Sequence, residues 1–91
     1  MSVTIRIPTP LRRVTNGQSK LDVESATLSE AIDMMEDQFP GIKERLLDES
    51  RELRHFVNVY VNGEDVRFLQ GLSTNIEDGT EVSIVPAVAG G

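Results

Sequence analysis

The chain ends in two glycines, Gly90 and Gly91, and this end is the part of the sequence whose residues could do chemistry. ATP can convert a terminal carboxylate into an acyl-adenylate, which a sulfur nucleophile can then displace. The product is a thiocarboxylate, a sulfur atom carried on the end of a protein. Because glycine has no Cβ, a narrow enzyme channel can close on such a backbone from all sides. A frayed terminus is the simpler alternative.

The residues before the two glycines form a slender tether. Pro86, Ala87, Val88 and Ala89 are all small or apolar, and they follow directly on a well-patterned strand. Six extended residues from Pro86 onward would span about 20 Å at about 3.3 Å each. We therefore expect residues 1–85 to form one domain and residues 86–91 to form a flexible C-terminal tail.

The composition excludes several other kinds of function. The chain carries 15 acidic and 9 basic residues, a net charge of −6, which argues against nucleic-acid binding. The acidity could instead steer the protein toward basic faces of partner enzymes. The pair Arg12-Arg13 is interpreted as part of a solvated loop in preference to an anion site. The absence of cysteine excludes disulfides, thiolate catalysis and cysteine-metal sites.

No feature of the sequence indicates a membrane, a metal or a bound cofactor. The N-terminus lacks the charged region and long apolar run of a signal peptide, and no apolar run is long enough to span a membrane. We therefore expect a cytoplasmic protein. The single histidine, His55, has no metal partner at a useful spacing and is interpreted as an ordinary strand-edge residue. The carboxylates fit a solvated surface, so an independent enzyme is the least favoured class.

Two strands and a helix are expected in the first half of the chain. Alternation of Val3, Ile5 and Ile7 predicts a strand that ends at Pro8, and Asn16-Gly17 predicts a turn before a second strand with Leu21 and Val23. The capping-box pattern from Thr27 to Glu30 predicts the start of a helix, which Pro40-Gly41 ends. One face of that helix is apolar: Leu28, Ala31, Ile32, Met35 and Phe39. A short helical turn and an exposed loop are expected at 41–55.

Three further strands are expected in the second half. The pattern of residues 56–61 predicts a strand, and Asn62-Gly63 predicts a tight turn that leads into a returning strand at 64–68. An irregular crossing follows. Residues 81–85 then predict the last strand. A single helix packed across a mixed sheet would bury every apolar face, which is an α+β layout. The first and last strands, each apolar on one face, are expected side by side at its centre.

An exposed apolar patch is the candidate docking surface. Phe56 and Tyr60 should face away from the buried valines of their strand, and Phe68 and Val85 could join them near the tail. Such a patch would suit an enzyme that receives the tail. The alternative is a second small core under the long loop, closed by Phe56 and Phe68.

Over its whole length the chain resembles the ubiquitin-like sulfur carriers of the β-grasp fold. This group includes the small subunit of molybdopterin synthase and the thiamine-pathway carrier. Within it, the chain is most similar to the mycobacterial type of cysteine-synthesis carrier. The residues that carry the resemblance to the group are 56–62, 64–67, Asp78-Gly79 with Val82 and Ile84, and 86–91; those that carry the resemblance to the mycobacterial type are Ile7-Pro8-Thr9, Leu11-Arg12, Thr15, Gly17-Gln18 and Glu44-Arg45-Leu46.

The resemblance implies a carrier that acts as a co-substrate and is not an enzyme itself. Gly91 would be adenylated with ATP by an E1-like enzyme and then thiolated, while Gly90 and residues 86–89 would thread the channel. A PLP-dependent synthase would pass the sulfur to an activated serine, and a zinc-containing JAB-type metalloprotease would release the new cysteine. Two alternatives remain: a small subunit bound to the large subunit of molybdopterin synthase, or a modifier joined to lysines of other proteins through Gly91.

Overall fold

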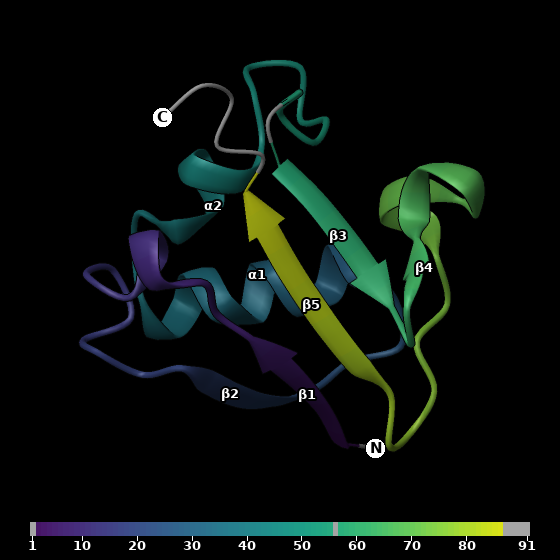
Figure 1. Ribbon diagram of the computed structural model, residues 1–91, viewed down its shortest axis with the longest axis horizontal. Coiled ribbons are helices and arrows are strands. Elements are labelled where there is room, and N and C mark those ends of the chain that lie inside the picture. Colours follow the sequence, from purple (N-terminus) through teal and green to yellow (C-terminus); the bar gives the residue numbers. More distant parts are fainter. Residues whose placement is uncertain (1, 56, 87–91) are drawn as a thin grey trace.

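The computed structural model describes residues 2–55 and 57–86, so Phe56 and the expected tail residues 87–91 lie outside the described part. Figure 1 shows a sheet with helices on one side of it. The strands are β1 (Ser2–Arg6), β2 (Lys20–Glu24), β3 (Val57–Val61), β4 (Glu64–Asp65) and β5 (Glu81–Pro86). The helices are α1 (Leu28–Gln38) and α2 (Ile42–Leu46), with short 3-10 turns η1 (Thr9–Leu11), η2 (Val66–Phe68) and η3 (Gly71–Ser73).

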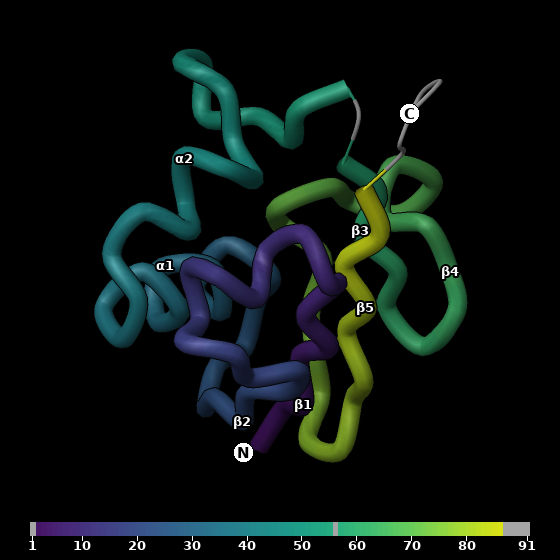
Figure 2. Tube along the Cα trace, turned by 60° about the vertical axis from the view of Figure 1, so that its left-hand side comes forward, coloured from purple at the N-terminus to yellow at the C-terminus, as the bar shows by residue number. Residues whose placement is uncertain are grey.

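The sheet has the strand order β2-β1-β5-β3-β4. β1 and β5 run parallel at its centre, while the other neighbouring pairs are antiparallel. This confirms the expected central pairing of the first and last strands. Figures 1 and 2 show the start of β1 beside the start of β5. The last residues of β5 therefore lie at the other end of the sheet, away from the first residues of β1.

The two Asn-Gly turns, one in each half of the chain, form where the sequence predicts them. Asn16 and Gly17 both have positive φ, at 58° and 85°, and so do Asn62 and Gly63, at 50° and 88°. Asparagine and glycine tolerate this backbone region better than other residues, which is why these pairs reverse the chain. The first turn brings Leu21 opposite Ile5 and Val23 opposite Val3, with all four side chains facing the core.

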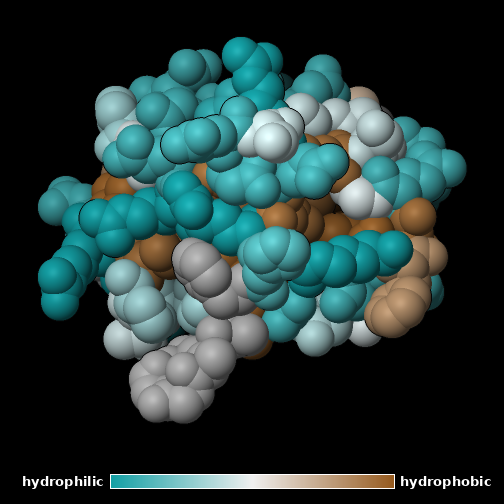
Figure 3. Space-filling model, turned by 90° about the horizontal axis from the view of Figure 1, so that it is seen from above, coloured by the Kyte–Doolittle hydropathy of each residue, from teal (hydrophilic) through white to brown (hydrophobic). Residues whose placement is uncertain are grey.

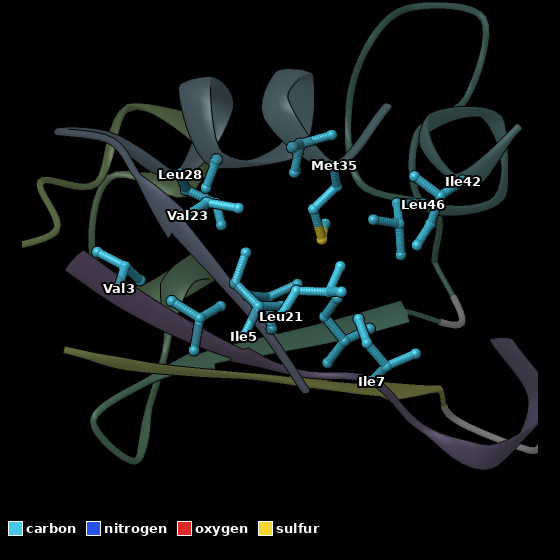
Figure 4. Close-up of a cluster of buried hydrophobic side chains, with 14 of the residues drawn as sticks. Val3, Ile5, Ile7, Leu21, Val23, Leu28, Met35, Ile42 and Leu46 are labelled. Atoms are coloured by element: carbon cyan, nitrogen blue, oxygen red, sulfur yellow. The ribbon is translucent and has the colours of Figure 1, made fainter. Parts of the chain in front are cut away.

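The core lies between α1 and the inner face of the sheet. Figure 4 shows side chains of β1 and β2 pointing toward those of α1 and α2. Helix α1 begins as expected, since the Thr27 hydroxyl accepts a hydrogen bond of 3.2 Å from the N–H of Glu30. The Glu30 carboxylate reaches back to the N–H of Ala26, one residue before the usual partner. The buried helix residues are Leu28, Ala31, Ile32 and Met35, while Phe39 is half-buried at the helix end.

Helix α2 is held at its start by a side chain of α1. The carboxylate of Glu36 accepts hydrogen bonds from the N–H groups of Gly41, at 3.1 Å, and Lys43, at 2.9 Å. These bonds favour the charged carboxylate and lower the pKa of Glu36 from its ordinary value of 4.5, with the Lys43 amide as the largest cause. Ile42 and Leu46 then anchor α2 in the core.

The prediction of a returning strand at 64–68 is wrong beyond the first two residues. β4 contains only Glu64 and Asp65, and Val66–Phe68 form the 3-10 turn η2. The Asp65 carboxylate accepts a hydrogen bond of 2.8 Å from the N–H of Arg67, which caps the turn and ends the ladder. Val66 is fully buried by the same turn. No helix in the described ranges is long and apolar enough to cross a membrane.

Candidate functional site

The site is built around the end of β5, the strand from which the expected tail continues. Its neighbour β1 pairs with it only as far as Ser83, since the chain bends away at Pro8, which has no N–H to donate. On the other side β3 pairs with β5 to its last residue, with Asn58 opposite Val85 and Val57 opposite Pro86. The end of β5 is therefore supported by one strand alone.

That supporting strand is held at its start by Arg67. The guanidinium Nη2 donates to the carbonyl oxygens of Arg54, at 2.9 Å, and Val57, at 2.8 Å. Nη1 donates to Oδ1 of Asn58 at 2.7 Å. Hydrogen bonds from a charged donor are stronger than neutral ones. Arg67 therefore ties together the two β3 residues that face Val85 and Pro86.

A hollow lies beside Pro86 on the helix side of the sheet. Its floor contains Val57 and Ile84, both almost fully buried, and its rim contains charged side chains of α2 and the following loop. The residues that line it are Pro10, Leu11, Glu44, Arg45, Arg54, Val57, Ile84 and Pro86. The Nε of Arg54 donates to the carbonyl oxygen of Glu44 at 3.0 Å, which fixes this arginine over α2.

The opposite face of the sheet holds two of the expected docking residues. Tyr60 lies opposite Ser83 and Val85 opposite Asn58, so these two side chains are diagonal neighbours on the outer face. Val85 is 44% exposed and Tyr60 is half-buried. Phe56, the third expected docking residue, lies outside the described residues.

Phe68 is the most exposed large apolar side chain in the described part of the chain, at 88%, and Leu69 beside it is 40% exposed. An exposure of this size is incompatible with a second core closed by Phe68. It comes from η2, beyond the edge strand β4, and not from the β3–β5 ladder. Figure 3 shows tan and brown atoms gathered at the right-hand edge of the molecule, the side on which Figure 1 draws β4.

The described residues contain no group of three or more metal-binding side chains that could hold an ion. His55 is exposed in the turn before β3. Arg12 and Arg13 follow η1, and Arg12 donates through Nε to the carbonyl oxygen of Ile7 at 3.2 Å. The sequence-predicted reactive residues Gly90 and Gly91, and Ala87, Val88 and Ala89 before them, lie outside the described residues.

A mixed five-stranded sheet crossed by one main helix, with its central strand ending at the surface, defines a ubiquitin-like β-grasp protein. The chain belongs to the ThiS family, whose model matches residues 5–91. It is 52% identical to the sulfur carrier protein CysO of Mycobacterium tuberculosis over 93 residues, which cover 100% of both chains. These similarities confirm the expected class, a sulfur carrier and not an enzyme.

Two other comparisons extend this result. A chain in the crystal structure of the Amycolatopsis orientalis BexX/CysO complex superimposes with a TM-score of 0.93 at 49% identity, covering 98% of this chain and 99% of that chain. The fold expected from the resemblance is thereby confirmed. Small archaeal modifier protein 3 of Haloferax volcanii is 33% identical over 94 residues, with 100% of both chains covered.

Sequence reasoning missed the arginines around Pro86. Arg45 and Arg67 lie within the phrases that carry the family resemblance, and Arg54 lies within the exposed loop expected at 41–55. They stand 9 and 13 residues apart in the chain, at positions 45, 54 and 67. No periodic pattern connects them, because α2, a loop and a 3-10 turn bring them to the same place.

Proposed function

We propose that this chain carries sulfur as a thiocarboxylate on Gly91, at the end of a tail formed by residues 86–91. The observation that supports this most strongly is the full-length similarity to a protein named as a sulfur carrier. The fold supports it too, since β5 ends at the surface with a free side toward β1. A tail leaving there can enter an enzyme without unfolding the domain.

The sulfur loading proceeds in two chemical steps. The Gly91 carboxylate oxygen attacks the α-phosphorus of ATP, which forms an acyl-adenylate and releases pyrophosphate. A sulfide-equivalent nucleophile then attacks the acyl carbon, the bond from carbon to the AMP oxygen breaks, and AMP leaves. An E1-like adenylating enzyme supplies the ATP site. The domain contributes the tail and the surface that docks on that enzyme.

The sulfur is used for cysteine synthesis. A PLP-dependent synthase holds an activated serine: the thiocarboxylate sulfur forms a bond to the serine Cβ, and the bond from Cβ to the activated oxygen breaks as the activating group leaves. A zinc-dependent JAB-type protease then hydrolyses the bond between Gly91 and the new cysteine, which releases the cysteine and restores the Gly91 carboxylate. The cytoplasm is the compartment, because activation consumes ATP. The phrases Ile7-Pro8-Thr9 and Leu11-Arg12, and the 52% identity to CysO, support this pathway over other uses of a thiocarboxylate.

The outer face beside the tail docks the activating enzyme. Tyr60 and Val85 form its described centre, and Phe56 would extend it along β3. Phe68 and Leu69 provide a second apolar contact beyond β4. Exposed apolar groups of this kind usually mark sites of interaction with other proteins.

Intact-mass measurement tests the sulfur loading. The chain is incubated with its E1-like enzyme, ATP and a sulfide source, and a variant lacking Gly91 serves as the control. The expected result is a mass gain equal to replacing one oxygen by one sulfur, in the full chain only. Absence of this gain in the full chain, with an enzyme that forms its own adenylate, would refute the proposal.

The sulfur acceptor is tested in a second step. The thiocarboxylated chain is mixed with the PLP-dependent synthase and an activated serine, and the expected product is the chain with one cysteine attached at Gly91. A synthase that turns over equally well with free sulfide would argue against a carrier-dependent pathway.

Protein modification is the second candidate function, and the similarity to a small archaeal modifier protein favours it. The same adenylate at Gly91 would then be attacked by the amino group of a lysine on another protein. Arg67 is the last basic residue before Gly91, so trypsin would leave residues 68–91 attached to a modified lysine. Deep proteomic coverage should find this remnant on lysines of other proteins, and it should vanish when the chain is deleted. Its absence at such coverage removes this candidate and leaves the carrier function standing.

A further inference from the structure

Two arginines line the hollow at the base of the tail and a third binds the far side of the neighbouring strand β3, in a protein that is acidic overall. Arg45 and Arg54 line the hollow that Pro86 also lines. Arg67 is bonded to the carbonyl oxygens of Arg54 and Val57, and Val57 lies opposite Pro86. We name Arg45, Arg54 and Arg67 the arginine collar. It comes from α2, from the loop before β3 and from η2, three segments that are separate in the sequence.

No collar residue forms an ion pair within the described structure. The ion pairs found among residues 2–55 and 57–86 are Arg6 with Glu81, at 2.9 Å, and Lys43 with Asp33, at 2.6 Å. Neither includes a collar residue. The collar's described hydrogen bonds instead go to neutral acceptors, such as the carbonyl oxygen of Glu44 for Arg54 and Oδ1 of Asn58 for Arg67.

The local charge thus has the opposite sign to that of the whole molecule. The lining of the hollow carries two arginines and one glutamate, whereas the whole chain carries 9 basic and 15 acidic residues. Arg45 and Arg67 are exposed and Arg54 is half-buried, so all three can meet a partner. A positive patch in a negative field orients an approaching molecule as well as attracting it.

The position of the collar decides what it can touch. Five extended residues from 87 to 91 cover about 17 Å at about 3.3 Å each. When the tail is threaded, the collar therefore stays at the entrance of the channel while the Gly91 carboxylate reacts far inside. An arginine side chain cannot cover that distance, so the phosphates of ATP at the reaction centre are out of its reach.

We propose that the arginine collar docks on a ring of carboxylate side chains at the mouth of the enzyme channel that receives the tail. The partner is a protein surface rich in Asp and Glu around a narrow opening, and the contact selects enzymes that have such an entrance. The proposal rests on the proposed function, since it needs an enzyme that threads the tail. Charge complementarity of this kind mainly raises association rate and specificity.

Charge reversal of one exposed collar residue tests the inference. Arg45→Glu changes the net charge from −6 to −8, and so does Lys20→Glu on the edge strand β2, two strands away from β5. Arg45→Lys keeps the charge at the collar. Each variant is assayed for pyrophosphate release with the E1-like enzyme at several salt concentrations, and KM is measured separately for the chain and for ATP.

The expected result is specific to the collar. At low salt, Arg45→Glu should lower kcat/KM for the chain about 10-fold through KM, whereas Lys20→Glu should stay within about 2-fold of the wild type. The difference should shrink to about 2-fold near 0.5 M salt, where the Debye length is about 4 Å. Arg45→Lys should behave like the wild type.

Two results would overturn the proposal. Equal losses for Arg45→Glu and Lys20→Glu would mean that overall charge acts and not the collar. A loss that appears in the KM for ATP would place the collar on the nucleotide. If the wild-type chain forms no adenylate, the proposed function fails instead, and affinities of the same variants for the enzyme without ATP still decide whether the collar binds it.

Discussion

The guanidinium group of Arg67 donates a hydrogen bond of 2.8 Å to the carbonyl oxygen of Val57, the residue that lies opposite Pro86 in the β3–β5 ladder. An arginine beyond the edge of the sheet thus fixes the strand that supports the base of the tail. The same group also bonds to the carbonyl oxygen of Arg54, which accepts the N–H of Val57. The start of β3 depends on this cluster because β4 pairs only with Tyr60 and Val61, so among the described residues no strand flanks Val57 on the side away from β5.

Arg67→Ala should therefore loosen the start of β3. Removing the charged donor breaks its hydrogen bonds to the Val57 and Arg54 carbonyl oxygens and to Oδ1 of Asn58, which should cost about 1–3 kcal/mol in free energy of unfolding. Denaturant unfolding measures the loss, and hydrogen exchange should speed up at the Val57 amide more than in β1. Arg13→Ala, at an exposed loop residue, is the control. Unchanged exchange at Val57 would contradict the role given to Arg67.

The carboxylate of Glu36 should make the free energy of unfolding of the domain fall as the pH is lowered. Its pKa is lowered in the folded state from 4.5, because it accepts the N–H groups of Lys43 and Gly41. A group whose pKa is lower when folded adds stability that is complete above the unfolded value and is lost as pH falls through the folded one. The wild type should therefore lose Tm below about pH 4.5.

Glu36→Gln removes this acid-dependent part, so the two Tm curves should be far apart near neutral pH and converge in acid. Thermal unfolding followed by circular dichroism from about pH 3 to 7 measures them. Glu49→Gln, at an exposed residue of the following loop, serves as the control for losing one negative charge. If the Tm curves of the wild type and Glu36→Gln stay equally far apart at every pH, the ionisation of Glu36 does not contribute to the pH dependence of Tm.

The fold was largely predictable because its apolar residues alternate or recur with clear periods. Val3 and Ile5 alternate with polar residues in β1, and the turn residues Asn62 and Gly63 carry the positive φ that their types favour. The error at 64–68 has a local cause. The Asp65 side chain caps a 3-10 turn by accepting the N–H of Arg67, which takes that N–H away from a strand ladder. An alternating strand pattern does not reveal this competition.

The surroundings of the tail were less predictable than the tail itself. Gly90 and Gly91 are recognisable from position and type alone. Arg45 and Arg54 meet in one hollow, and Arg67 bonds to the Arg54 carbonyl, only through tertiary packing; in the sequence each has the appearance of an ordinary solvated charge. Phe68 shows the same limit, since its exposure depends on where β4 ends.

The core residue Ile5 should be essential for folding. It is 1% exposed and lies on β1, paired with Leu21 on one side and Val82 on the other. Ile5→Ala leaves a cavity and should cost about 2–5 kcal/mol, a large part of the 5–15 kcal/mol typical of a domain. Denaturant unfolding measures it, with Met34→Ala on the exposed side of α1 as control. A loss below about 1 kcal/mol would mean that the site is repacked.

Gly90 should be required for activation and not for folding. Every described pair of the β3–β5 ladder lies at or before Pro86, four residues before Gly90, so the described fold does not depend on the side chain at position 90. Gly90→Val adds a branched side chain where the enzyme channel must close on the backbone. We expect an unchanged Tm and a loss of adenylate formation of at least about 100-fold. Val88→Ala, a nearby change that removes bulk, should keep most of the activity; similar losses in both variants would argue against a channel narrow at the glycine.

The exposed side chain of Val85 should contribute to enzyme binding at the outer face. It is 44% exposed, and Met34 on α1, at 39%, provides a control of nearly equal exposure on the other side of the molecule. Val85→Asp places a charge in the apolar contact, so KM for the chain should rise about 10-fold or more while kcat stays the same. Val85→Thr keeps the branched shape that suits a strand and should give a smaller rise. Because Asp also disfavours a strand, the Tm of each variant is measured alongside. If Met34→Asp raises KM as much as Val85→Asp does, Val85 makes no specific contribution to binding of the activating enzyme.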